Sequence, residues 1–166
     1  NDKGVNMERI NRIFKNEKYR SHIEKTAEYE KKRKFCHHDM THFMNVARIA
    51  QIFNLEEGLM IPKDVVYAAA LLHDVGRDIQ YLNEMPHEMA GAAIAPEILW
   101  ECDFSSDEAS EIIRAIREHR NEKIREERSL AGILYRADKL SRDCYSCKME
   151  KSCDWKEGRK NKRIVI

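Results

Sequence analysis

The stretch VVYAAALLHDVGR, residues 65–77, decides how the rest of the chain is interpreted. Its first part, residues 65–72, is the most apolar run in the sequence, long enough for a buried helix but far short of the ~20 apolar residues of a membrane span. Pro62 suits the first turn of this helix, and the polar pair His73-Asp74 ends it. A buried carboxylate without a partner costs several kcal/mol, so this pair needs a cation or strong donors nearby.

Helical signals extend in both directions from this stretch. The other expected helices run from Asp39 to about Asn54, from Pro86 onward, from Ser105 or Ser106 to about Glu118, and from about Ser129 to Asp143. Pro96 should kink or end the helix that Pro86 opens. Two amphipathic helical pieces should meet near residues 15–20.

The chain lacks the signals of strands and linkers. Residues 163–166 are the one β-like segment, and with only six Gly and three Pro the connections should be short. We therefore expect an all-α fold, a compact single-domain helical bundle in 166 residues. A helical extension (1–34) should pack on a core domain (35–143), and a cysteine-containing tail (144–166) should follow.

Composition narrows the functional classes. The 30 Lys and Arg nearly cancel the 29 Asp and Glu, and a net charge of +1 gives no strong nucleic-acid signal. The basic clusters at 31–34 and 159–163 are interpreted as a solvated face and a charged tail. Five cysteines, with no membrane span and no secretory signal pattern at the start, predict a reducing, cytoplasmic location.

Several histidines and aspartates fall at core-facing positions. Each lies at helical spacing from apolar residues or ends an apolar helix: His42, His73, Asp74, His87, His119 and Asp138. Any single one of these histidines is more often a satisfied core or surface residue, and an aspartate at a helix end is commonly a cap. Six such residues on five helices together predict a metal site.

The same residues carry a family resemblance. The ordered set His42, His73-Asp74 and Asp138 resembles the H…HD…D signature of the HD superfamily, in the contexts HFMNVARIA, ALLHDVGR and YRADKLSR. His87 and His119 resemble the extra histidines of its dinuclear members. The likeness spans roughly residues 35–142 and implies a helical bundle of the HD type.

The resemblance implies a dinuclear metal centre. It assigns His42, His73, Asp74 and Asp138 to one divalent transition metal, with Asp74 bridging to a second that His87 and His119 hold. A mixed set of imidazole and carboxylate ligands suits iron or manganese and also nickel or zinc. Ligand type alone does not choose among these metals.

The resemblance also implies catalytic residues beside the metals: Asp74, Arg77 and His38. Arg77 matches a position where dinuclear relatives often carry Lys or Arg, and its planar fork could clamp a phosphate. The alternative for Arg77 is a salt bridge to Asp78 or Glu84. His38 could reach the pocket as a donor to substrate.

The implied function is that of a phosphohydrolase. The substrate would be a phosphate ester or anhydride of a nucleotide or small phosphorylated metabolite, cleaved by a metal-activated water. The spacing resembles small single-domain relatives, among them the symmetrical dinucleoside tetraphosphate hydrolases, but a substrate does not follow from architecture. Alternatives are a mixed-valent di-iron oxygenase on the same scaffold and a non-enzymatic nucleotide-sensing module. The sequence leaves the oligomeric state open.

A second cluster follows the last expected helix. Cys144, Cys147 and Cys153 have the spacing C-x2-C-x5-C, and the first pair is a good chelate for structural zinc or an iron–sulfur cluster. The fourth ligand could be Cys102, Cys36, His22 or Asp154. The alternatives are free thiols beneath a tail, an adventitious disulfide, or a segment that walls one side of the pocket.

Overall fold

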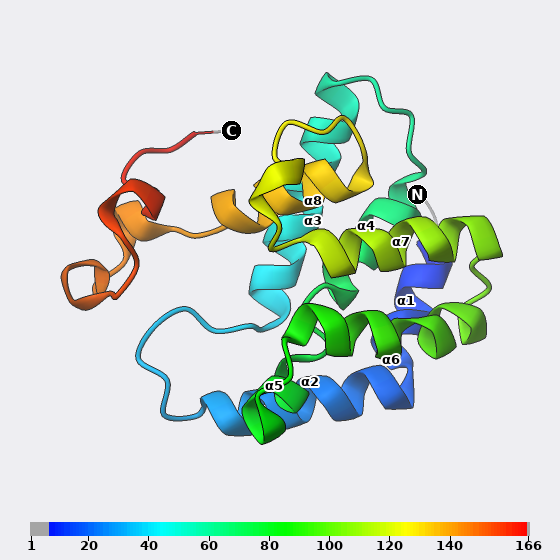
Figure 1. The fold of residues 1–166 in the computed structure, drawn as a ribbon, viewed down its shortest axis with the longest axis horizontal. Coiled ribbons are helices and arrows are strands. Elements are labelled where there is room, and N and C mark those ends of the chain that lie inside the picture. Colours follow the sequence, from blue (N-terminus) through cyan, green and yellow to red (C-terminus); the bar gives the residue numbers. More distant parts are fainter. Residues whose placement is uncertain (1–6, 166) are drawn as a thin grey trace, which may run out of the picture.

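A computed structural model describes residues 7–165 of the chain (Figure 1). Within that range the protein is all helical, as predicted, and contains no strand. Its α-helices are α1 (Glu8–Lys15), α2 (Glu17–Glu30), α3 (Met40–Glu56), α4 (Lys63–Leu72), α5 (Arg77–Asn83), α6 (His87–Glu101), α7 (Ser106–Glu118) and α8 (Leu130–Leu140). Short 3-10 turns follow at η1 (Glu122–Ile124), η2 (Cys144–Ser146), η3 (Glu150–Ser152) and η4 (Glu157–Arg159).

Helix α4, the apolar stretch of the sequence, forms the centre of the core. Seven of its ten residues are buried, and it packs against α3, α7, α8 and α1. Helices α6 and α7 pack side by side, and α7 also contacts α8 (Figure 1). Because α4 is surrounded, whatever stands at its C-terminal end lies inside the bundle.

The predicted helix starts are confirmed. The Asp39 side chain accepts a hydrogen bond from the backbone N–H of His42, which caps α3. Ser105 and Glu108 form a complete capping box at α7, and Ser129 caps α8 through Gly132 N–H. The two amphipathic pieces expected near the start are α1 and α2, while residues 1–6 of the expected N-terminal extension lie outside the described residues.

Pro96 does not end its helix, contrary to one of the two expected outcomes. Helix α6 continues through it to Glu101, and Ala95, Ile98 and Leu99 around it are fully buried. Proline costs the helix one backbone hydrogen bond, and burial of these side chains in the core compensates for that loss.

Helix α5 was not predicted as a separate element. It begins directly after the His73-Asp74 pair, at the tight corner of Gly76. A Cβ on Gly76 would lie 2.5 Å from both Gly91 N and His87 O, so only glycine lets α6 approach this corner. The close approach brings His87, the first residue of α6, to the end of α4.

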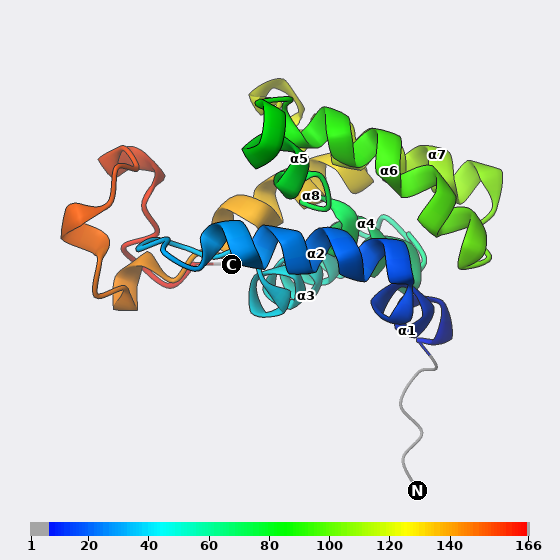
Figure 2. The same cartoon turned by 90° about the horizontal axis from the view of Figure 1, so that it is seen from below.

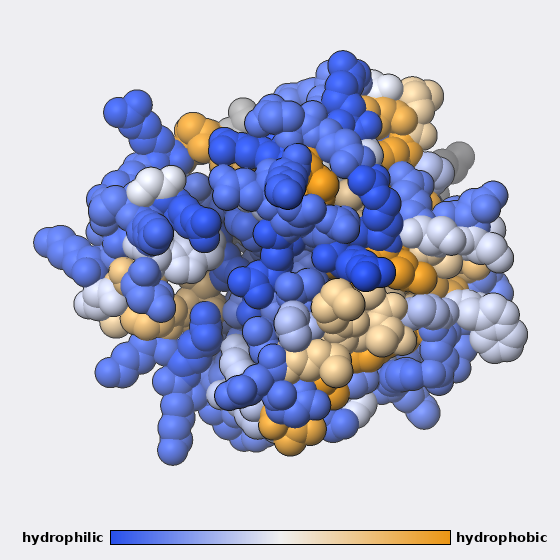
Figure 3. Space-filling view, viewed as in Figure 1, coloured by the Kyte–Doolittle hydropathy of each residue, from blue (hydrophilic) through white to orange (hydrophobic). Residues whose placement is uncertain are grey.

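The C-terminal tail differs from the helical body. None of residues 143–165 is buried, and their only regular structure is the 3-10 turns η2 to η4. In Figures 1 and 2 this tail, orange to red, stands at one end of the molecule, on the same side as the loop between α2 and α3. Figure 3 shows a largely hydrophilic surface over this end, with apolar areas mainly over the helical body.

No helix among residues 7–165 combines the length and apolar character needed to cross a membrane.

Candidate metal centre

All six predicted ligand residues come together in the interior. They form two adjacent groups of buried donors, each with ligand atoms within 4.8 Å of one another. The first group is His42 of α3, His73 after α4 and Asp138 of α8, and the second is Asp74, His87 of α6 and His119 after α7. These are the only such groups within the described part of the chain.

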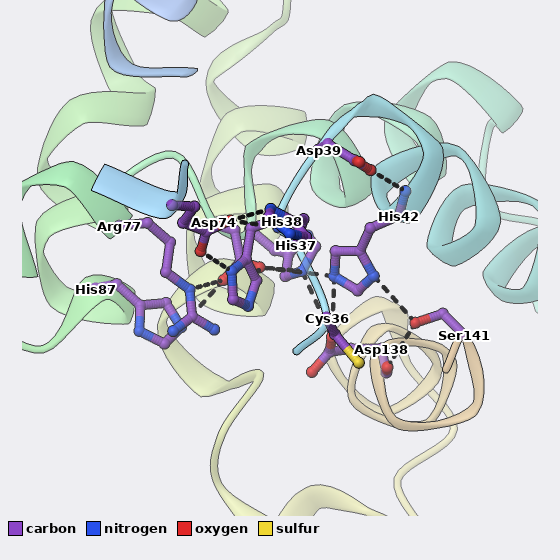
Figure 4. A network of polar contacts seen from close by, with 12 residues as sticks. Cys36, His37, His38, Asp39, His42, Asp74, Arg77, His87, Asp138 and Ser141 are labelled. Carbon is purple, nitrogen blue, oxygen red and sulfur yellow. Dashed lines mark hydrogen bonds and ion pairs between the residues drawn. The ribbon is translucent and has the colours of Figure 1, made fainter. Parts of the chain in front are cut away.

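Asp74 lies between the two groups and turns one oxygen to each. Its Oδ2 atom lies 3.2 Å from His73 Nε2 and 3.6 Å from His42 Nε2. Its Oδ1 atom lies 3.1 Å from His87 Nε2 and 3.8 Å from His119 Nε2. Figure 4 shows this carboxylate between His42 and His87. A carboxylate placed in this way can bridge two cations.

The four histidines present Nε2 to the centre because Nδ1 is engaged elsewhere. The Nδ1 partners are Ala70 O for His73 (2.7 Å), Ile116 O for His119 (2.6 Å), Gln80 Oε1 for His87 (2.7 Å) and Ser141 Oγ for His42 (3.2 Å). Ser141 donates its own proton to Asp138 O, so it accepts from His42. Partners of this kind fix the tautomer that leaves the Nε2 lone pair free for a metal.

The centre contains polar atoms that the protein itself does not satisfy. His42 Nε2, His73 Nε2 and Asp74 Oδ2 are buried and have no hydrogen-bond partner. The Nε2 atoms of His87 and His119 lie 3.0 Å apart. At this distance the two nitrogen lone pairs repel each other unless a proton or a cation lies nearby. Imidazole and carboxylate donors of this number and burial fit divalent transition metals.

Charges inside the centre also favour a cation. Burial alone would raise the pKa of Asp74, but the charges of Arg77 and His73 outweigh it and hold that pKa well below its usual value. Burial would lower the pKa of His73, but the carboxylates of Asp74 and Asp138 raise it to about 10. Without a metal, these two carboxylates therefore favour the protonated form of the His73 imidazole. A bound metal would displace that proton.

His38 reaches the edge of the centre from the loop before α3. Its Nε2 atom lies 3.9 Å from Asp74 Oδ2 (Figure 4). The same atom lies 3.5 Å from the Arg142 guanidinium. Its Nδ1 atom pairs with Glu30 Oε1 at 2.5 Å. Glu30 is a buried carboxylate at the end of α2, and Tyr81 donates to it as well.

Arg77 binds neither Asp78 nor Glu84, the two partners considered from the sequence. Its Nε donates to Asp74 Oδ1 at 3.0 Å, and Asp78 pairs instead with His22 at 2.8 Å. Arg77 therefore holds the carboxylate that lies between the two donor groups. Lys139 makes a similar contact to Asp138, at 2.5 Å.

A cavity of about 360 Å3 opens beside the first group of ligands. His42, Ser141 and Arg142 line its inner part, and the C-terminal tail forms one wall. The tail cysteines lie in this wall and, among the described residues, do not form a group with ligand spacing for a single ion. Cys36 lines the cavity from the loop before α3, whereas Cys102 and His22, two other suggested ligands, are not part of it.

Sequence reasoning missed the residues that orient the ligands. Glu30, Gln80 and Ser141 each hold a histidine of the site. Glu30 shares a buried face of α2 with Tyr19 and Thr26, and a charged residue on that face was the available signal. Gln80 lies on the helix that was not predicted, and no local pattern points to it.

Known proteins resemble the chain in the region of this site. The HD domain family model matches residues 39–143. An uncharacterized protein of Clostridium beijerinckii is 42% identical over 158 residues, 95% of this chain and 99% of that protein. Ribonuclease Y of Lawsonia intracellularis is 31% identical over 102 residues, 61% of this chain and 18% of that protein.

One solved structure shares the architecture. It is the crystal structure of a predicted HD superfamily hydrolase from an uncultured Thermotogales bacterium. The TM-score is 0.60 at 26% sequence identity, and the match covers 87% of this chain and 80% of that chain.

Proposed function

Since the chain belongs to the HD domain family, we propose that it is a metal-dependent phosphohydrolase that cleaves a phosphate ester or anhydride of a nucleotide or small phosphorylated metabolite. The structural likeness to a predicted HD superfamily hydrolase supports a hydrolytic activity. The two donor groups support the use of two divalent ions.

The position of Asp74 is the observation that carries this proposal. Each of its oxygens faces a different pair of histidines, at 3.1 to 3.8 Å. Two divalent ions held there would neutralise phosphate oxygens and lower the pKa of a bound water. A site that served only to stabilise the fold would have its ligands closed around one ion.

Residues beside the ligands supply the remaining functions. Arg77 engages Asp74 through Nε alone, so Nη1 and Nη2 remain to bind a phosphate oxygen. His38, oriented by Glu30, can hold a proton near the leaving group of a substrate bound at the centre. His38 is buried and Arg77 is partly exposed, and the position of both side chains beside Asp74 supports these roles.

The substrate class follows from two considerations. The cavity beside His42 has a volume of about 360 Å3, which suits a small molecule or a few residues of a polymer. The net charge of +1 does not favour a long nucleic acid as substrate. The likeness to Ribonuclease Y makes a short RNA the first phosphodiester substrate to test.

The test is hydrolysis by protein loaded with manganese or iron. Aryl phosphates, nucleotides, dinucleoside polyphosphates and a short RNA form the substrate panel, and released phosphate or nucleotide is measured. Asp74→Ala should abolish both metal retention and turnover, whereas Glu111→Ala, which removes an exposed carboxylate of α7, should change neither. Full metal content and a near-normal rate in Asp74→Ala would disprove the proposal.

The same donor set, four histidines and two aspartates, keeps an oxygenase as the second candidate. Iron with a mixed-valent magnetic signal and oxygen-dependent turnover, without phosphate release, would favour it. Metal binding without any turnover would favour a sensing module.

A further inference from the structure

Four of the five cysteines surround one cavity. Cys36 comes from the loop before α3, and Cys144, Cys147 and Cys153 come from the tail, more than a hundred residues later in the chain. All four thiols are free. The fifth, Cys102, is buried at the end of α6 and lies outside this cavity.

The tail has no hydrophobic core that would hold it in place. No residue from 143 to 165 is buried, and the turns η2 to η4 give it little regular structure. Its polar attachments to the helical body are few, chiefly Asn161 Nδ2, which donates to the backbone oxygens of Lys139 and Arg142. The ion pair of Lys160 with Glu150 lies within the tail. Segments without a core usually depend on disulfides or bound metal for a defined structure.

The arrangement of the thiols argues against a single ion. Four thiolates around zinc, at 2.3 Å from the metal in a tetrahedron, lie about 3.8 Å from one another. Among the described residues, no three of these sulfur atoms lie within 4.8 Å of one another, although all four cysteines line the same cavity. A wider ring of four cysteines is the arrangement that surrounds an iron–sulfur cluster.

The guanidinium of Arg142 places a positive charge beside the four cysteines, where it would offset the negative charge of a cluster held by thiolates. The Arg142 side chain lines the cavity and is buried, and its Nε has no hydrogen-bond partner. The guanidinium also lies 5.5 Å from the centre of the Trp155 ring, two residues after Cys153.

We propose that Cys36, Cys144, Cys147 and Cys153 together ligate one iron–sulfur cluster, which fixes the tail to the loop before α3. His42 and Ser141 line the same cavity, so the cluster walls one side of the metal centre. The proposal is independent of the reaction at that centre, because none of its four ligands belongs to either donor group.

The test measures acid-labile sulfide and iron in the full chain, purified without oxygen or reconstituted with ferric iron, sulfide and an excess of thiol that reduces part of the iron. Sulfide is the deciding measurement, because a dinuclear centre of histidines and aspartates contains none. Asp74→Ala, which is expected to lose the iron of that centre, is measured in parallel. We expect inorganic sulfide and the visible charge-transfer absorption of a cluster. Each of Cys36→Ser, Cys144→Ser, Cys147→Ser and Cys153→Ser should reduce both to background.

Cys102→Ser is the matched control and should retain sulfide, iron and absorption. Helix content, measured by circular dichroism, should stay unchanged in the tail variants because the tail contains no α-helix. Trypsin should cleave the basic tail faster after cluster loss. Bound zinc without sulfide, no metal at the cysteines, or equal sulfide loss in Cys102→Ser would each overturn the proposal, and none would bear on phosphohydrolase activity.

Discussion

The Nδ1 atom of His38 lies 2.5 Å from Oε1 of Glu30, and the backbone N–H of the same histidine donates to Oε2 at 2.9 Å. Tyr81 adds a third donor to this carboxylate. Burial would raise the pKa of Glu30, but these donors, His38 first, lower it to about 2. Glu30 is therefore an anion at neutral pH, and it directs His38 Nε2 toward Asp74.

Glu30→Gln should lower turnover without loss of metal. The amide keeps the size of the side chain but removes the charge that orients His38 and stabilises its protonated form. Loss of a partner of this kind typically costs ~10- to 100-fold in activity. Steady-state rates and metal content are measured on the same preparations.

Tyr81→Phe is the control, because it removes one donor to Glu30 and leaves His38 in place. Its rate should stay within a few-fold of wild type. If His38 gives a proton to the leaving group, Glu30→Gln should slow alkyl phosphates much more than nitrophenyl phosphates. Equal losses on both substrates would contradict the proton-transfer role and leave only a structural one.

His87→Ala and His119→Ala should each reduce the bound metal toward one ion per chain. Both histidines face Asp74 Oδ1 and belong to the second donor group. His42→Ala should instead disturb the first group, which Asp74 Oδ2 faces. Elemental analysis after equilibration with excess manganese or iron gives the count.

A fully loaded wild-type protein with no more than one metal would contradict the dinuclear assignment. So would full occupancy in both His87→Ala and His119→Ala. Helix content measured on the same samples shows that a lost metal is not a lost fold.

The ligand set was predictable because each member breaks a local pattern. His42, His119 and Asp138 lie at helical spacing from apolar residues, so their burial follows from the periodicity of their own helix. The order of these residues then matches one family signature. A polar residue in an apolar stripe is visible without any knowledge of tertiary structure.

The supporting residues were not predictable in that way. Gln80 and Glu30 act on histidines in other elements, and only the packed bundle shows which side chain meets which. Gly76 and Pro96 show the same limit. The close approach of α6 to Gly76 and the continuation of α6 through Pro96 both depend on tertiary packing. The three tail cysteines and Cys36 line one cavity, and the spacing of these residues in the sequence does not show that they lie around the same cavity.

Glu108→Gln should lower the melting temperature at pH 7 by about 1–3 °C, the effect of one partly exposed ion pair. Glu108 accepts two hydrogen bonds from Arg9, at 2.7 and 2.9 Å, which joins α1 to α7. The Arg9 contact, opposed by partial burial, lowers the pKa of Glu108 from 4.5 to about 2. Glutamine still permits the capping interaction with Ser105.

The sign of the pH dependence follows from that lowered pKa. The ion pair stabilises the fold fully above pH 4.5, and its contribution is lost as the pH falls toward 2. The difference in melting temperature between wild type and Glu108→Gln should shrink over this window. A difference that stays constant from pH 7 to pH 2.5 would mean that packing, and not charge, explains it. Asp107→Asn, at an exposed neighbour, should show no change.

Arg77→Ala should lower kcat/KM roughly ten- to hundredfold when metal is saturating. One charge-assisted contact to a phosphate is worth about 1.5–3 kcal/mol, which corresponds to that loss. Because Arg77 also holds Asp74 Oδ1 at 3.0 Å, metal affinity can change too, and the rate must be compared at full metal content. Arg77→Lys should recover only part of the rate, since an ammonium lacks the bidentate fork.

Arg120→Ala is the matched control for this variant. Arg120 is an exposed arginine near the second donor group, and it lies 3.6 Å from Glu88. Its loss should leave kcat/KM within about twofold, as expected for an exposed ion pair. If Arg77 serves only to hold Asp74, Arg77→Ala should bind metal more weakly and melt earlier, yet turn over normally once loaded. An unchanged kcat/KM at full metal content would therefore reject the phosphate contact, whereas a loss that excess metal cannot restore would establish it.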